Sequence, residues 1–144
     1  MKSFKELPVH EQEALLKFPA YITLLAANSD KGMDEIEKKS AIKFVHIKTY
    51  SCRPILSEFY HEAEKEFKNN IIQLDKELPK NRDQRELAIK KELRKLEPIL
   101  LKLGKEYAFT MHHSMKTFKD HVSRAHRNVL EYFLFPLPIP GITD

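Results

Sequence analysis

The strongest constraint on this fold is a pair of helical patterns separated by a very short loop. Residues 21–44 read YITLLAANSDKGMDEIEKKSAIKF. The apolar run ends in the loop 29–34, and a second helical pattern begins at once. Two helices joined by so few residues must lie side by side or cross tightly. This segment therefore fixes the local architecture of the N-terminal part of the chain.

The composition favours helices elsewhere as well. The 144 residues contain only 3 glycines, whereas an all-β chain of this length needs many more turn residues. Over residues 56–78, apolar side chains recur at spacings of three and four and predict a long amphipathic helix. We expect one all-α domain over residues 1–144, folded as a compact bundle of five to seven helices.

The sequence predicts two further helices, and for each of them it indicates the apolar residues. The helix over residues 34–50 is expected to direct five residues inward, namely Ile36, Ala41, Phe44, Val45 and Ile47. Asn81 can cap the helix after the turn at residues 78–81. Pro98 is expected to bend or restart that helix, whose apolar residues are Leu87, Leu93, Leu96, Leu100 and Leu103.

Three acids near the short loop form the candidate metal site. Asp30, Asp34 and Glu37 lie within eight residues, and carboxylate oxygens are the ligands that hard cations prefer. Asp34 followed three residues later by Glu37 is also the signature of a helix start, with the aspartate as N-cap and the glutamate returning a hydrogen bond. Capping is the favoured interpretation, and a weakly held divalent cation is the alternative. No other cofactor is indicated.

The remaining motifs suggest chemistry less directly. Glu58 and His61 have the Glu-x-x-His spacing of di-iron carboxylate bundles, but such bundles use two of these motifs and the chain has one. A metal-dependent enzyme using either the acidic loop or this pair is kept as an alternative. Cys52 is expected to be a small buried residue. Surface or capping positions are expected for the later histidines, which are His112, His113, His121 and His126.

The charge distribution favours a soluble protein without a dedicated nucleic-acid surface. The formal net charge is +4, and the excess lies in the segment 79–104, where acids are interleaved with the bases. A solvated helix face explains that mixture, and nucleic-acid binding through the basic helix 81–97 is the alternative. No secretory signal or transmembrane segment is recognisable, so we expect a cytoplasmic location.

Residues 20–45 resemble the start of the TerB-like domain family, which is named for tellurite resistance. Members of that family have an apolar helix that ends in an Ala-Asp-Gly type turn, then an isoleucine and clustered acids that open the next helix. Asp30 matches the turn aspartate and Met33 the isoleucine, while Gly32 falls one position late. Residues 103–122 look like the final helices of related small bacterial proteins. The resemblance implies an all-α bundle, without enzymatic activity, associated with metal ions or with membrane-linked stress complexes.

The sequence therefore predicts a non-enzymatic accessory or stress-response protein. Its tail, from about residue 132, is apolar and carries Pro136, Pro138 and Pro140. So many large apolar side chains in one short segment usually mark an interface. We expect the tail to pack against the bundle, or alternatively to form a homodimer or bind a protein partner.

Overall fold

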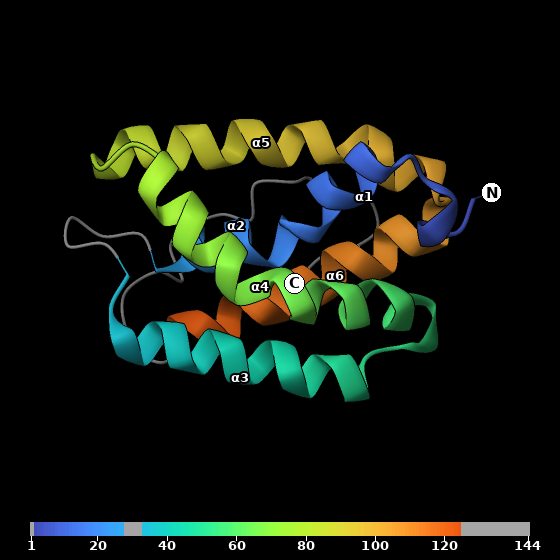
Figure 1. The fold of residues 1–144 in the computed structure, drawn as a ribbon, viewed down its shortest axis with the longest axis horizontal. Helices are drawn as coiled ribbons and strands as arrows, with labels where there is room; N and C mark the ends of the chain where they lie inside the picture. Colours follow the sequence, from blue (N-terminus) through green and yellow to red (C-terminus); the bar gives the residue numbers. More distant parts are fainter. Residues whose placement is uncertain (1, 28–32, 125–144) are drawn as a thin grey trace.

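The computed structural model describes residues 2–27 and 33–124, and these residues form helices joined by short turns (Figure 1). No β-strand occurs within those two ranges, so the all-α prediction is confirmed. The predicted tail from residue 132 lies outside the described residues. In chain order the elements are the 3-10 helix η1 (Phe4–Glu6), α1 (Val9–Leu16), α2 (Phe18–Ala26), α3 (Glu35–Ser51), the 3-10 helix η2 (Pro54–Leu56), α4 (Ser57–Glu77), α5 (Arg82–Lys102) and α6 (Lys105–Arg124).

Helix α2 occupies the centre of the bundle. All nine of its residues are buried, and it packs against α4, α5 and α6. Its sequence is apolar nearly all round, which is the pattern of a helix enclosed on every side. Pro19 lies in its first turn, where the missing N–H costs no intrahelical bond. The Thr23 hydroxyl donates to the Pro19 carbonyl at 2.8 Å, so this buried hydroxyl needs no water.

Helix α4 lies against α2 and confirms the predicted amphipathic pattern. Its buried residues follow the spacing of three and four that the sequence shows, and they are Phe59, Tyr60, Ala63, Phe67, Ile71 and Leu74. The Phe67 ring meets the Phe118 ring of α6 edge-on, with centroids 5.9 Å apart. The Tyr60 hydroxyl lies 2.5 Å from Ser114 Oγ, which gives this buried phenol a hydrogen-bond partner.

Helix α3 buries a narrower face than the sequence predicted. Ile36 and Ile47 are 61% and 45% exposed, so their predicted inward orientation is wrong. The buried residues repeat every fourth position and include polar members, and they are Glu37, Ala41, Val45 and Thr49. A helix on the outside of the bundle needs only one such stripe, and apolar residues off the stripe remain at the surface.

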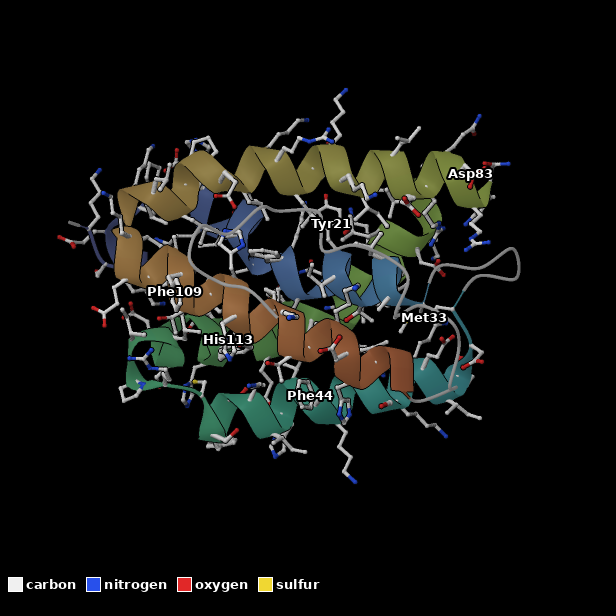
Figure 2. The ribbon with its side chains drawn as sticks, turned by 180° about the vertical axis from the view of Figure 1, so that it is seen from behind. Tyr21, Met33, Phe44, Asp83, Phe109 and His113 are labelled. Atoms are coloured by element: carbon white, nitrogen blue, oxygen red, sulfur yellow. The ribbon has the colours of Figure 1, made fainter. Side chains whose placement is uncertain are left out.

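Phe44 attaches α3 to α6. Its ring stacks on His121 with centroids 4.0 Å apart, and it meets Phe118 edge-on at 5.1 Å. Figure 2 shows Phe44 on the side of α3 that faces α6. His121 is therefore a packing residue in an aromatic cluster, which the prediction of surface or capping histidines did not include.

Helix α5 forms one edge of the bundle and continues through Pro98. It is a single helix, so the predicted restart does not occur. Pro98 is exposed, and the carbonyl that its ring deprives of a partner can bond water instead. Leu87 is 68% exposed and does not belong to the apolar face. Gly104 follows with φ of 101°, a conformation that glycine adopts without strain and that turns the chain into α6.

Candidate functional site

The acidic residues at the start of α3 form a capping box. Asp34 Oδ1 accepts a hydrogen bond from the Glu37 backbone N–H at 2.8 Å, and Glu37 Oε1 accepts one from the Asp34 N–H at 3.2 Å. The capping interpretation is confirmed for these two residues. Asp30 lies outside the described residues, so the metal-site prediction remains a prediction. Within the described ranges, no group of three histidine, cysteine or acidic side chains is arranged to hold a metal ion.

The Glu58 and His61 pair is not assembled into a larger site among the residues that the structure describes. His61 Nδ1 lies 2.9 Å from the Ser57 carbonyl oxygen, and its N–H can therefore satisfy a carbonyl on its own helix. The His61 ring also meets the Tyr50 ring edge-on, with centroids 5.6 Å apart. These contacts place the histidine on the outer surface between α3 and α4.

His112 is buried, and the prediction that it is a surface or capping residue is wrong. Its Nε2 lies 2.5 Å from Glu97 Oε1, so the pair joins α5 to α6. Burial lowers the pKa of His112 to about 4 and raises the pKa of Glu97, which favours the uncharged form of each side chain. The Phe18 ring meets the imidazole in a T-shaped arrangement, with ring centroids 6.4 Å apart.

Cys52 lies just after α3 and is partly buried against the core. Burial raises the pKa of its thiol. The protonated thiol is a poor nucleophile, so this position fits the structural role that the sequence predicted.

The basic segment of α5 has many of its charges paired with acids. Lys90 contacts Glu86 at 2.8 Å, and Lys95 contacts Glu92 at 3.0 Å. Lys102 reaches across to Glu11 of α1 at 2.6 Å. Ion pairs of this kind reduce the positive charge available to a phosphate backbone. They agree with the prediction of a solvated helix face and leave nucleic-acid binding an untested alternative.

Arg85 has a structural role that could not be recognised from the number of basic residues in this segment. Its guanidinium, only 5% exposed, donates to Asp75 Oδ1 at 2.8 Å, to the Asp75 carbonyl at 2.8 Å and to the Pro79 carbonyl at 2.9 Å. One side chain therefore provides hydrogen-bond donors for a carboxylate and a carbonyl near the C-terminal end of α4 and for a carbonyl in the turn into α5. Because Arg85 is committed to the fold, a mutational test of nucleic-acid binding belongs at Lys91 or Arg94.

An apolar groove lies between α3 and α4. It encloses about 250 Å³ and is lined by Glu35, Lys38, Lys39, Ile42, Lys68, Ile71 and Ile72. We call it the α3–α4 groove. Ile42 and Ile72 are 38% and 41% exposed within it. The sequence does carry a signal for this groove. Ile42 of α3 and Ile72 of α4 are large apolar residues that do not belong to the buried face of their helix.

The lysines of the α3–α4 groove differ in their pairing. Lys38 lies 3.6 Å from Glu35 on the same helix. Lys39 and Lys68 are exposed, and neither forms an ion pair with a described residue. The groove thus combines an apolar floor with uncompensated positive charge at its rim.

Comparison with protein-family models, with curated proteins and with solved structures finds no match. In the described ranges, no helix combines the length and apolar character needed to cross a bilayer. A function for this chain must therefore be argued from its own residues.

Replacing Arg85 with alanine should lower the free energy of unfolding by roughly 2–4 kcal/mol, because Asp75 and two carbonyls lose a buried partner together. Arg85→Lys should recover only part of this loss, since an ammonium cannot reproduce the guanidinium fork. Urea denaturation measures both variants. Lys95→Ala, which removes an exposed pair on the same helix, is the control and should cost less than about 1 kcal/mol. Equal effects of the two alanine substitutions would contradict the role assigned to Arg85.

Titration calorimetry of the full chain with calcium, magnesium and zinc should show no binding as tight as micromolar. Asp34 and Glu37 already bond to each other's backbone, and the three acids fall short of a full calcium shell. Micromolar affinity that Asp30→Ala abolishes would instead establish the metal site. Asp83→Ala, at the start of α5, provides a matched acidic control and should leave any binding unchanged.

Proposed function

We propose that this chain is a non-enzymatic accessory protein of the TerB-like kind, with a role in stress response, that acts by binding a protein partner. The α3–α4 groove carries the proposal, because it leaves isoleucine side chains at the surface beside unpaired lysines. Soluble helical domains normally cover such side chains, and an apolar patch with a polar rim usually marks an interaction site. Weak divalent-cation binding by Asp30, Asp34 and Glu37 is a secondary part of the proposal.

The chemistry of the groove favours an acidic amphipathic helix as its occupant. Ile42 and Ile72 offer an apolar floor between two neighbouring helices, and a third helix can lay its own apolar face there. Lys39 and Lys68 would then meet carboxylates at the edges of the partner helix. Complementary charge of this kind contributes specificity and the rate of association more than affinity.

The apolar tail from about residue 132 is the second contact segment in this proposal. Its prolines restrict the chain and reduce the entropy lost on docking. In order of preference, it packs against the bundle, joins two copies of the chain, or binds a protein partner.

A designed peptide tests the groove directly. The probe is an 18-residue helix with leucines on one face and glutamates on both flanks, and the control peptide has the same composition in scrambled order. Fluorescence anisotropy should detect binding of the first peptide to the full chain, with affinity weakened about tenfold or more by the double substitution Ile42→Ser and Ile72→Ser. Binding should also weaken as salt is raised.

Ile47→Ser is the matched control for the peptide experiment. Ile47 is a similarly exposed isoleucine on the same helix, outside the groove. It should leave the peptide affinity unchanged within about twofold. Equal loss from the Ile47 variant, or equal binding of the scrambled peptide, would reject the groove as the binding surface.

A further inference from the structure

A second cavity lies on another side of the molecule, where α2 meets the end of α4 and the first half of α5. It is open to solvent and has a volume of about 460 Å³. Leu74, Leu78 and Pro79 supply apolar walls, and Tyr21 reaches it from the central helix. Figure 2 shows Tyr21 on the side of α2 that faces α5. The cavity is thus a place where the otherwise enclosed helix α2 contributes a polar group to the surface.

The Tyr21 hydroxyl has no hydrogen-bond partner among the described residues, although the residue is only 7% exposed. It differs from the hydroxyl of Tyr107, which is sealed inside the protein without a partner, because the Tyr21 oxygen keeps solvent contact. Desolvation and the nearby charges of Glu92 and Glu77 raise the pKa of Tyr21 to about 12. The group is therefore a neutral hydroxyl that lies near both carboxylates and faces the cavity.

The charged groups around this hydroxyl are of both signs. Glu77 Oε2 accepts from Gln73 at 2.9 Å and Glu92 Oε2 accepts from Lys95 at 3.0 Å, so each carboxylate uses one oxygen in a bond on its own helix. Lys17 and Lys91 also line the cavity, and neither forms an ion pair with a described residue. A purely anionic ligand would meet the glutamates, and a purely cationic ligand would meet the lysines.

We propose that this cavity binds a small zwitterion, specifically a free α-amino acid with an apolar side chain. Glu77 and Glu92 would hold its ammonium group, while Lys17 and Lys91 would hold its carboxylate. The Tyr21 hydroxyl can accept from the ammonium or donate to the carboxylate, and the leucine and proline walls would cover the side chain. This site is separate from the α3–α4 groove, so either proposal can fail without the other.

Leucine is the probe for this site. Calorimetry or NMR titration of the full chain should give a dissociation constant below about 1 mM for L-leucine. N-acetyl-leucine lacks the ammonium and leucine amide lacks the carboxylate, and each should bind tenfold or more weakly because one pair of charges loses its partner. No detectable binding of leucine at about 10 mM, or binding of either analogue as tight as that of leucine, would overturn the proposal.

Substitutions identify the cavity as the place of binding. Tyr21→Phe should weaken leucine binding about three- to tenfold while leaving the melting temperature unchanged or higher, because the hydroxyl makes no hydrogen bond to any residue that the structure describes. Lys91→Ala, at an exposed position that forms no ion pair with a described residue, should also weaken binding. Tyr50→Phe, at an exposed tyrosine on α3, is the control and should have no effect. Leucine binding that Tyr21→Phe and Lys91→Ala leave within about twofold of the wild type would place the ligand elsewhere and reject this site.

Discussion

The complete burial of α2 is the constraint on which the rest of this structure depends. A helix with no exposed face must be surrounded, and α4, α5 and α6 supply that surround. These helices turn their apolar faces toward α2, as the buried residues of α4 show. Burial on this scale is the dominant favourable term in folding. It also means that a polar group on α2 must either be satisfied inside the protein, as Thr23 is, or open onto a cavity, as Tyr21 does.

The outer helices carry the surfaces that can act on other molecules. Because α2 fills the centre, α3 and α5 each bury a stripe and leave the opposite face in solvent. Several large apolar residues remain on those faces, among them Ile42 and Leu87. Polar cross-links then fix the outer helices in position. Arg85 joins the C-terminal end of α4 to the N-terminal end of α5. The contact between His112 and Glu97 joins α5 to α6. The groove and the Tyr21 cavity both lie where such outer helices meet.

Periodicity predicted much of this fold, since a long amphipathic helix such as α4 leaves an unambiguous pattern. The helix start at Asp34 was also predictable, because capping depends on residues three apart in sequence. The inward face of α3 was not, because hydrophobicity alone selected Ile36 and Ile47, whereas packing selected a stripe that includes Glu37. Pairings between distant residues, such as His112 with Glu97, leave no local signal. The Tyr21 cavity was missed for the same reason: its charges come from α4, from α5 and from Lys17 between α1 and α2.

Native-state hydrogen exchange tests the central position of α2 most directly. If α2 is enclosed by the other helices, its amides can exchange only when the whole bundle opens. The free energy of opening measured for the amides of residues 22–25 should therefore equal the global free energy of unfolding from denaturant titration. The amides of α3 should open with a smaller free energy, because that helix is covered on one side. Exchange of the α2 amides at a free energy well below the global value, with α3 or α5 the slowest to exchange, would contradict this account.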